Sequence, residues 1–304
     1  MRLQRDVRSP PLLQPDSRVA LVAPSGPLRD EHDLERAVAT TRAMGWEPVV
    51  GSYVLERDGY LAGSDEHRAA DFNRFACDDS IDAIWCIRGG YGAMRLLGRV
   101  DYDVWKRRPK ALIGYSDITA LHSAIGPRAG LITFHGPTAR SDLTQFSEAS
   151  FRAAMSLGSE PCGEAPRASI LEGGRARGRL VGGNLALVAA LLGTPYSPSF
   201  DGAILVLEDV NESVYRIDRM LTQMRLSGAL DRLAGIAFGH FTDIPPEPTD
   251  EQRPISTVLR EIAEHCGVPC LANIPLGHIA DQWTVPLGAM AQLDADARTL
   301  TIER

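Results

Sequence analysis

A serine, a carboxylate and a histidine, far apart in the sequence, have side chains that together can carry out acyl transfer. Ser116 follows an apolar run that ends at Gly114, and a stretch able to form a helix begins directly after it. Such a strand-to-helix corner exposes the serine Oγ and leaves the next backbone N–H, that of Asp117, facing a developing oxyanion. A serine is also a favoured helix cap, and the segment lacks the Gly-x-Ser-x-Gly pattern of α/β-hydrolases. Ser116 is therefore a candidate nucleophile whose assignment depends on its partners.

The candidate partners are Glu208 and His278. Glu208 and Asp209 follow the apolar run 203–207, where a buried strand should end. His278 lies after Gly277 in an apolar loop. In a serine hydrolase the histidine takes the serine proton, the carboxylate orients the histidine, and backbone amides bind the oxyanion. Acids at strand ends are often solvated, and a lone loop histidine is more often structural, but together the three side chains supply what acyl transfer requires.

A glycine-rich loop follows another predicted strand, with the sequence Arg88-Gly89-Gly90-Tyr91-Gly92. Its glycines allow the backbone to approach a ligand or to present amides to an anion. The spacing departs from Gly-x-Gly-x-x-Gly, so it is a weak dinucleotide signal. Arg88 offers a planar, two-pronged donor for a carboxylate. An exposed arginine, or one paired with a structural acid, is an equally good interpretation of the same residue.

Strands and helices alternate along the first half of the chain. Alternation of this kind predicts an α/β fold with a parallel sheet and helices on both faces, and active-site loops then gather at the carboxyl ends of the strands. The glycine-rich loop and the Ser116 corner both lie at that edge. The expected strands are 19–23, 47–50, 83–87, 111–114 and 131–134, and the expected helices include 30–44, 64–76 and 93–97.

The pattern loosens between residues 146 and 177, where prolines and glycines interrupt a weakly periodic stretch. We therefore expect an N-terminal extension at 1–17, a nucleophile domain at 18–160, a linker at 161–176 and a C-terminal domain at 177–304. In the last of these we expect strands at 177–181, 203–207 and 235–239, helices at 184–192, 214–227 and 255–265, and closing antiparallel strands at 283–287, 289–293 and 299–302.

Composition restricts the class of protein. The 304 residues are 44% hydrophobic and 23% charged, as in soluble globular proteins, and the net charge of -7 argues against a nucleic-acid partner. No apolar stretch reaches the length of a membrane span, and the charged, proline-containing start is unlike a signal peptide. Five cysteines without a Cys-x-x-Cys pair fit reduced thiols. We expect a cytoplasmic protein with a frayed N-terminal extension.

Two other classes of function fit some of these residues. A metal-dependent hydrolase would use His135, His240 and His278 with Glu208 or Asp209, but these histidines lack a local pair such as His-x-x-x-His. A sugar- or nucleotide-binding module without catalysis would fit the same sheet, since a fold alone does not fix function. The expectation is that the protein needs neither a metal nor a cofactor.

The chain resembles the murein LD-carboxypeptidase family of serine peptidases, which includes muramoyltetrapeptide carboxypeptidases and microcin C immunity peptidases. The matching stretches run in family order from about residue 18 to the end and are jointly specific. They are 22–27 (Val-Ala-Pro-Ser-Gly-Pro), 88–92, 113–117 (Ile-Gly-Tyr-Ser-Asp), 133–137 (Thr-Phe-His-Gly-Pro), 182–185 (Gly-Gly-Asn-Leu), 207–210 (Leu-Glu-Asp-Val), 215–221 (Tyr-Arg-Ile-Asp-Arg-Met-Leu) and 277–278 (Gly-His).

The resemblance implies a role for each candidate residue. Ser116 is expected to be the nucleophile, Glu208 the orienting acid and His278 the general base. The amide of Asp117, with that of Gly89 or Gly90, would form the oxyanion hole, and we expect Arg88, Tyr91 and Asn184 to bind substrate. The family further implies a Rossmann-like N-terminal domain, a smaller β-rich C-terminal domain with the active site between them, and a homodimer.

The expected reaction follows from the branch of the family. Residues 193–200 form a short connection, which favours the tetrapeptide branch because the immunity branch carries additional loop there. We therefore expect cleavage of the L,D-peptide bond that releases terminal D-alanine from a murein tetrapeptide, as in peptidoglycan recycling. The alternative is cleavage of an aminoacyl-nucleotide conjugate of the microcin C type.

Overall fold

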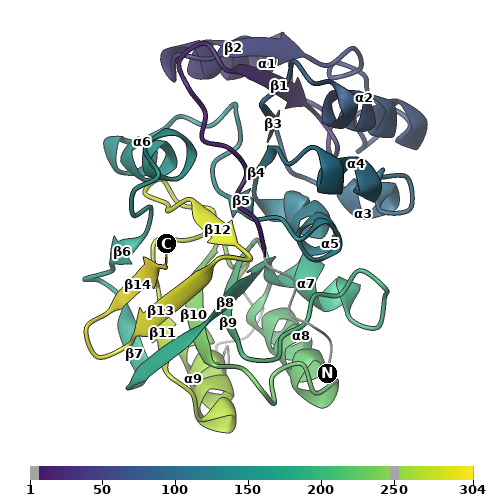
Figure 1. Cartoon of the computed structure of the whole chain (residues 1–304). Helices are drawn as coiled ribbons and strands as arrows, with labels where there is room; N and C mark the ends of the chain where they lie inside the picture. Colours follow the sequence, from purple (N-terminus) through teal and green to yellow (C-terminus); the bar gives the residue numbers. More distant parts are fainter. Residues whose placement is uncertain (1–6, 247–252, 304) are drawn as a thin grey trace. The chain divides into compact units, whose positions relative to one another are not determined.

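The computed structural model describes residues 7–246 and 253–303 (Figure 1). The chain divides into two compact units, Met1–Ser159 with Thr284–Gly288, and Glu160–Trp283 with Ala289–Arg304. Each unit combines strands and helices, so the predicted α/β fold class is confirmed. Within the described residues, no helix has the length and apolar character needed to cross a bilayer.

The first unit is built on a six-stranded sheet, counted over its described residues, with the order β12-β5-β4-β3-β1-β2. Five strands are parallel, and the edge strand β12 is antiparallel to β5. The central strands are buried apolar runs, as expected of a parallel sheet covered on both faces. Their bounds are β1 Arg18–Val22, β2 Glu47–Val50, β3 Ala83–Cys86, β4 Ala111–Gly114, β5 Thr133–His135 and β12 Val285–Leu287.

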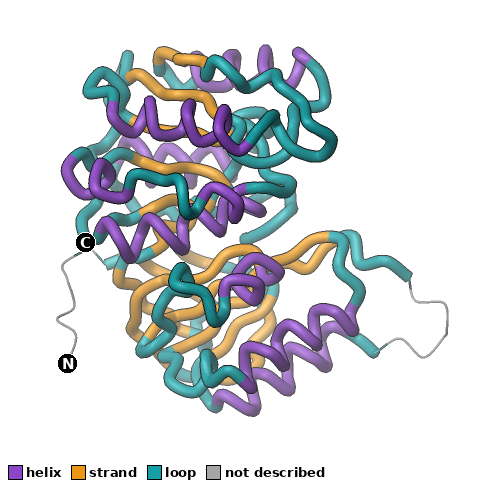
Figure 2. The backbone as a smooth tube through the Cα atoms, turned by 90° about the vertical axis from the view of Figure 1, so that its right-hand side faces the viewer, coloured by secondary structure: helices purple, strands orange, loops and turns teal. Residues whose placement is uncertain are grey.

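Helices cover both faces of this sheet (Figure 2). One face packs against α1 (Glu31–Ala43), α6 (Gln145–Arg152) and the π-helical turn η2 (Ala153–Leu157), in a core that contains Trp85 and Phe151. The other face carries α2 (Asp65–Cys77), α3 (Ala93–Leu96), α4 (Tyr102–Arg107) and α5 (Thr119–Ala129). Side chains at the N-caps of α1, α2, α4 and α6 accept first-turn amides, which fixes where these helices begin.

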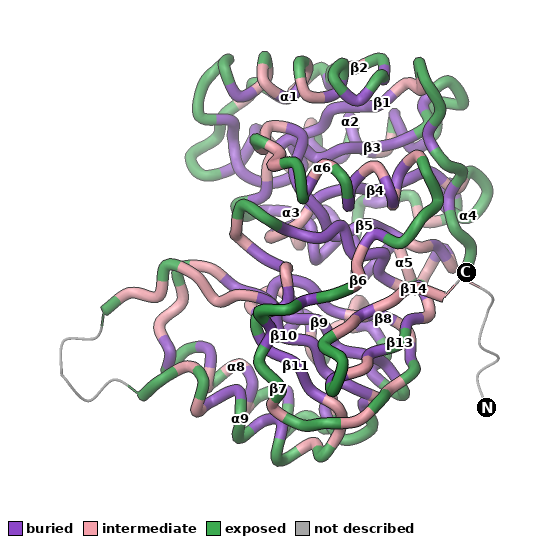
Figure 3. The backbone as a smooth tube through the Cα atoms, turned by 90° about the vertical axis from the view of Figure 1, so that its left-hand side faces the viewer, coloured by how far each residue is buried: buried purple, intermediate pink, exposed green. Residues whose placement is uncertain are grey.

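The second unit holds an eight-stranded sheet, over its described residues, with the order β6-β14-β13-β8-β9-β10-β11-β7. Strands β8 to β11 are parallel and the outer strands antiparallel. The bounds are β6 Gly163–Glu164, β7 Ser169–Glu172, β8 Arg175–Asn184, β9 Ala203–Val210, β10 Gly235–Thr242, β11 Cys270–Ala272, β13 Met290–Asp294 and β14 Thr299–Ile302, with helices α7 Leu185–Leu191, α8 Val214–Leu226 and α9 Ile255–Cys266. The three helices share one apolar core with β9 and β10, whose backbones are largely buried (Figure 3).

Two expectations about chain organisation differ from the structure. Residues 161–176, expected to be a linker, include β6 and β7, which pair with the outer strands β14 and β11. The strand expected at 283–287 is Val285–Leu287, and it pairs with β5 of the first sheet. Both strands in the presumed linker are short and mostly exposed, so they lack the apolar periodicity that predicts a strand. A sequence pattern also does not specify which sheet a short strand joins.

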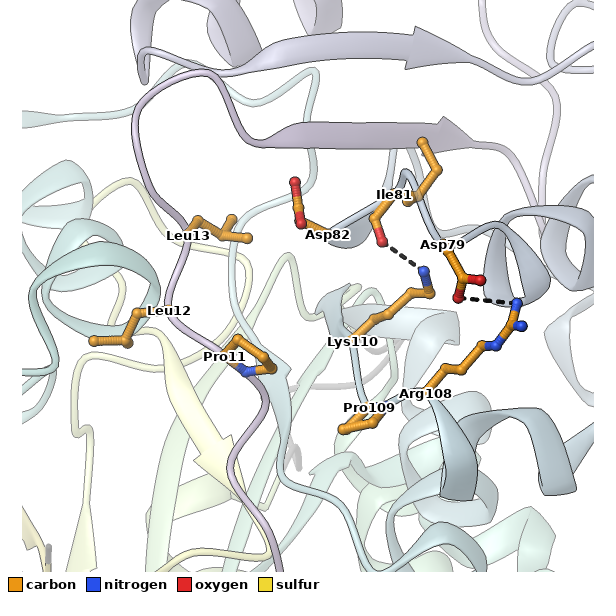
Figure 4. Close-up of a pocket in the computed structure, with 9 residues that line it drawn as sticks. All are labelled: Pro11, Leu12, Leu13, Asp79, Ile81, Asp82, Arg108, Pro109 and Lys110. Carbon is orange, nitrogen blue, oxygen red and sulfur yellow. Dashed lines mark hydrogen bonds and ion pairs between the residues drawn. The ribbon is translucent and has the colours of Figure 1, made fainter.

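The described part of the N-terminal extension is packed onto the first unit, so the expectation of a frayed extension is wrong for residues 7–17. The amide of Arg8 donates to Gly130 O at 2.9 Å, and that of Leu13 to Met155 O at 2.8 Å. Leu13 is 3% exposed. Pro11, Leu12 and Leu13 line one side of a cavity of about 250 Å³ (Figure 4), whose other residues are Asp79, Ile81, Asp82, Arg108, Pro109 and Lys110. This cavity lies at the amino ends of β3 and β4, at the opposite edge of the sheet from the Ser116 corner. Residues 1–6 lie outside the described residues.

Candidate active site

Ser116 occupies a strained corner between β4 and α5. The strand ends at Gly114, and Ser116 opens the 3-10 turn η1 (Ser116–Ile118) that leads into the helix. Its φ is +62°, a left-handed conformation that non-glycine residues adopt only at a cost of about 1–2 kcal/mol. The N-cap positions of η1 and α5 are Tyr115 and Ile118, so Ser116 is not the N-cap of α5, the role that the sequence also allowed. The geometry is that of a nucleophile elbow.

The glycine-rich loop after β3 lies directly against Ser116. A Cβ atom added to Gly89 would come within 3.0 Å of Ser116 Cβ and 3.1 Å of its Oγ. Gly90 has a φ of +111°, and the carbonyl of Gly89 accepts the amide of Gly26 at 3.1 Å. Only glycine permits this approach. The backbone of Gly89 therefore lies beside the Ser116 side chain.

Asp117 joins the serine corner to the next loop through its side chain. It is almost fully buried, and its Oδ2 accepts the amide of Ala93, at the start of α3, at 2.7 Å. Burial raises the pKa of Asp117, and the bond from Ala93 offsets part of that shift. The side chain thus holds the end of the glycine-rich loop beside the amide that we expect to bind the oxyanion.

Two residues that the sequence analysis did not identify also support the corner. Arg68, in α2 and 2% exposed, donates to the carbonyls of Pro24 and Gly92, and so connects the loops after β1 and β3. His122, in α5, has its Nε2 2.8 Å from Gly114 O. Burial lowers the pKa of His122 to about 4, so the ring is neutral at pH 7 and donates from Nε2. Nothing in the local sequence distinguishes either residue from an ordinary residue on a helix.

In the second unit, Glu208 and His278 form a hydrogen-bonded pair. Nδ1 of His278 lies 2.8 Å from Oε2 of Glu208, whose side chain is fully buried. Gly277 makes the approach possible: its φ is +119°, and an added Cβ would lie 3.0 Å from Glu208 Cβ and 3.1 Å from His240 O. Because the carboxylate accepts from Nδ1–H, the lone pair that can take a proton is on Nε2.

Asp209 makes different contacts from Glu208, because successive side chains of a strand point to opposite faces. It accepts Asn184 Nδ2 at 2.8 Å and the amide of Ala186, in the first turn of α7, at 3.0 Å. Burial raises the pKa of Asp209 to about 6. Asn184 is itself the N-cap of α7 and accepts the amide of Leu187. The structure therefore places Asn184, one of the expected substrate-binding residues, in a helix-capping pair.

The other expected substrate-binding residues lie on the loop after β3. Arg88 is half-buried, and its guanidinium donates to the carbonyl of Pro27. Tyr91 is 53% exposed, and its ring meets that of Tyr60 edge-on, with 5.4 Å between centroids. Both residues therefore flank Gly89 and Gly90 in the sequence, and Gly89 lies against Ser116.

The histidines considered for a metal site lie on separate elements. His135 ends β5 in the first unit, whereas His240 belongs to β10 and His278 to a loop of the second unit. Over the part of the chain that the structure describes, no group of three or more His, Cys, Asp or Glu side chains is arranged to hold a metal ion.

Comparison with known proteins identifies the class. The LD-carboxypeptidase N-terminal domain of the Peptidase S66 family matches residues 19–136, and the LD-carboxypeptidase C-terminal domain matches residues 177–293. The chain therefore belongs to this family of serine peptidases, as the sequence motifs predict. It is 42% identical over 308 residues to a putative carboxypeptidase of Streptomyces coelicolor, covering 99% of this chain and 97% of the relative. It is 35% identical over 297 residues to the murein tetrapeptide carboxypeptidase of Pseudomonas aeruginosa, covering 92% and 94%.

Solved structures show the same architecture. The muramoyltetrapeptide carboxypeptidase of Oxalobacter formigenes superposes with a TM-score of 0.84 at 29% identity, covering 94% of this chain and 98% of that one. The microcin C7 self-immunity protein MccF, in complex with glutamyl sulfamoyl guanosine, gives a TM-score of 0.87 at 24% identity, covering 97% and 98%. The second likeness establishes a shared fold.

Proposed function

We propose that this protein is a serine carboxypeptidase that releases the terminal D-alanine of murein tetrapeptides by hydrolysing the preceding L,D-peptide bond. The observation that carries the proposal is the strained Ser116 corner, with the Gly89 backbone held against its side chain. Backbone strain of this kind persists where function requires it. The substrate is inferred from the relative in Pseudomonas aeruginosa, which is a murein tetrapeptide carboxypeptidase.

In the proposed reaction, Ser116 Oγ attacks the carbonyl carbon that precedes D-alanine, and Nε2 of His278 takes the hydroxyl proton. The Glu208 carboxylate, hydrogen-bonded to Nδ1, keeps the ring in the required tautomer and stabilises the imidazolium. The tetrahedral oxyanion accepts the amide of Asp117 and that of Gly89 or Gly90. His278 then gives its proton to the departing amine of D-alanine, and water hydrolyses the acyl-enzyme to regenerate Ser116.

Substrate positioning is assigned to residues beside the nucleophile. A carboxypeptidase must hold the terminal carboxylate while the neighbouring carbonyl lies over the serine. Arg88 precedes Gly89 directly and has a planar donor group suited to that carboxylate. Tyr91 exposes its ring on the same loop, so we assign it to contact the peptide. Asn184 is assigned to substrate binding in addition to its contacts with Asp209 and Leu187, because a side-chain amide has two N–H donors and two acceptor lone pairs.

We further propose that residues 18–160 carry the nucleophile and residues 177–304 the acid and base, that the enzyme acts in the cytoplasm on recovered wall fragments, and that it is a homodimer. The family resemblance supports the assignment of the halves and the dimer. Light scattering on the purified protein tests the dimer directly, because a monomeric mass at working concentration contradicts it.

The experiment that tests the function compares four substrates by mass spectrometry. They are the tetrapeptide, its analogue ending in L-alanine, the pentapeptide ending in D-alanyl-D-alanine, and an aminoacyl sulfamoyl nucleoside. We expect release of one alanine from the tetrapeptide at a rate at least about 100-fold above the L-alanine analogue, because inversion places the methyl group where the carboxylate must bind. Preferential cleavage of the pentapeptide would contradict the proposal. Cleavage of the nucleoside conjugate alone would assign the protein to the immunity branch instead.

A further inference from the structure

Within the described residues, five arginines converge on residues 27–33, the segment that joins β1 to α1. They come from α1 and from loops that follow β1, β2, β3 and β5, at the same edge of the first sheet as Ser116. They are Arg29, Arg36, Arg57, Arg88 and Arg140.

Four of the five guanidinium groups make specific contacts, and Arg29 joins the cluster through its backbone amide. Arg88 donates to Pro27 O, and Arg57 Nη2 donates to Leu28 O at 2.6 Å. Arg36 and Arg140 both reach Asp33 Oδ1 at 3.2 Å. The other oxygen of Asp33 accepts the backbone amide of Arg29 at 2.9 Å. The guanidinium groups of the other four arginines are therefore held in an ordered arrangement, and the Arg29 side chain is exposed beside them.

The carboxylates in contact with this cluster do not balance its charge. Asp33, 1% exposed, is shared by Arg36 and Arg140, and exposed Asp142 lies 3.6 Å from Arg36. In the described parts of the chain, no ion pair joins Arg29, Arg57 or Arg88 to an acid. Burial lowers the pKa of Arg88, and the nearby charges of Arg140 and Arg29 lower it further. Gathering like charges in a half-buried place costs stability that a bound anion would restore.

Two guanidinium nitrogens of the cluster also lack hydrogen-bond partners among the described residues. Nε of Arg36 and Nε of Arg140 are buried and have no hydrogen-bond partner. Buried polar atoms in native proteins are almost always paired, so these two nitrogens call for a partner from outside the chain, either water or a ligand. The outer end, at Arg29 and Arg57, is exposed and open to a ligand.

We propose that this arginine cluster binds two carboxylates of one peptide, the terminal carboxylate at Arg88 and a second carboxylate at the Arg57 and Arg29 end. The inference rests on the proposed function and names its substrate class, an acidic peptide with a free carboxylate inside its chain. Arg88 is adjacent to Gly89, whose backbone touches Ser116, so the terminal carboxylate at Arg88 places the scissile bond near the nucleophile. Murein tetrapeptides carry free carboxylates on their glutamyl and diaminopimelyl residues, which makes them ligands of this kind.

A double-mutant cycle tests the second carboxylate. The specificity constant kcat/KM is measured for the free tetrapeptide and for two analogues, one amidated at the glutamyl carboxylate and one at the diaminopimelyl carboxylate. We expect at least one amidation to lower kcat/KM by tenfold or more in the wild type, and by less than twofold in Arg57→Gln, because the removed carboxylate and the removed guanidinium are partners. The matched control is Arg107→Gln, an exposed arginine at the end of α4, which should keep the tenfold effect. An equal loss on amidation in wild type and Arg57→Gln would overturn the proposal.

A second readout separates this proposal from the proposed function. The melting temperature Tm is measured with glutarate, a simple dicarboxylate, against sodium chloride at equal ionic strength. We expect glutarate to raise the wild-type Tm by about 2 °C or more, and to leave Arg57→Gln unchanged, because a ligand stabilises only the state that binds it. If the tetrapeptide is not cleaved but glutarate stabilises only chains with Arg57, the proposed function is wrong and the anion site at the arginine cluster is supported. If the tetrapeptide is cleaved without coupling to Arg57 and glutarate has no selective effect, the cluster proposal fails and the function stands.

Discussion

His122 is expected to make the structure around the Ser116 corner sensitive to acid. Its Nε2 donates to Gly114 O, at the last residue of β4, and burial lowers the pKa of the ring from 6.5 to about 4. Protonation would place a buried charge beneath the corner that presents Ser116. The informative perturbation is His122→Gln, since a glutamine amide can still donate to the carbonyl but does not titrate.

The magnitude follows from the two pKa values. Between pH 6.5 and 4 the unfolded chain holds a proton on this ring that the folded chain does not, so stability falls as the pH falls. The full effect is about 6.5 minus 4, or 2.5 pKa units, and at 1.36 kcal/mol per unit it is about 3 kcal/mol. This stability is fully present above pH 6.5 and is lost on acidification toward pH 4.

Urea unfolding followed by tryptophan fluorescence at pH 7.5, 6, 5 and 4.5 measures the effect. Carboxylates also titrate in this range, but their contribution cancels in the difference between wild type and His122→Gln. We expect the wild type to lose about 2 kcal/mol more than the variant between pH 7.5 and 4.5, most of the full linkage effect. A variant at an exposed histidine, His265→Gln, should follow the wild-type curve. Parallel curves for wild type and His122→Gln would refute the reasoning.

Three further variants probe the same corner. Ser116→Gly should be more stable than Ser116→Ala by about 1 kcal/mol in urea unfolding, because glycine adopts the positive φ without strain; equal stability would contradict a strained corner. Gly89→Ala should lower kcat by about 100-fold or more while folding normally by circular dichroism, because its Cβ would displace Ser116; near-normal kcat would show that the loop does not position the serine. Arg68→Leu should cost about 2–4 kcal/mol of stability, because it leaves Asp65 without its buried partner and two loop carbonyls unsatisfied; a loss below about 1 kcal/mol would contradict its structural role.

Most of the fold follows from local patterns in the sequence. Strand β3 is a continuous apolar run shortly before the glycine-rich loop, β9 begins with five apolar residues before Glu208 and Asp209, and helices such as α2 begin at a capping serine. These signals come from neighbouring residues, so the strands and helices can be predicted from the sequence. The partner of β12 is not local, because three residues with no distinctive pattern pair with β5 some 150 residues earlier in the chain. The short strands β6 and β7 likewise form because they pair with β14 and β11, and their own sequences do not predict them.

The candidate site likewise has parts that local sequence predicts and parts that it does not. The Ser116 corner was predictable because strand, turn and helix are contiguous there. The contact between Glu208 and His278 could be predicted only from the family resemblance, because 70 residues separate the two. The alternation of side chains along β9 could have separated Glu208 from Asp209, because one faces the helices and the other does not. Arg68 and His122 gave no signal because their importance arises only from burial in the folded unit.

The central claim is that Ser116 is the nucleophile, and covalent labelling tests it most directly. The protein is treated with a fluorophosphonate, with and without excess murein tetrapeptide, and digested for peptide mass spectrometry. We predict a single phosphonylated site at Ser116, slower labelling in the presence of tetrapeptide, no labelling of Ser116→Ala, and at least about 10³-fold lower turnover by that variant. Turnover by Ser116→Ala close to that of the wild type, or labelling at another residue that abolishes activity, would contradict the account.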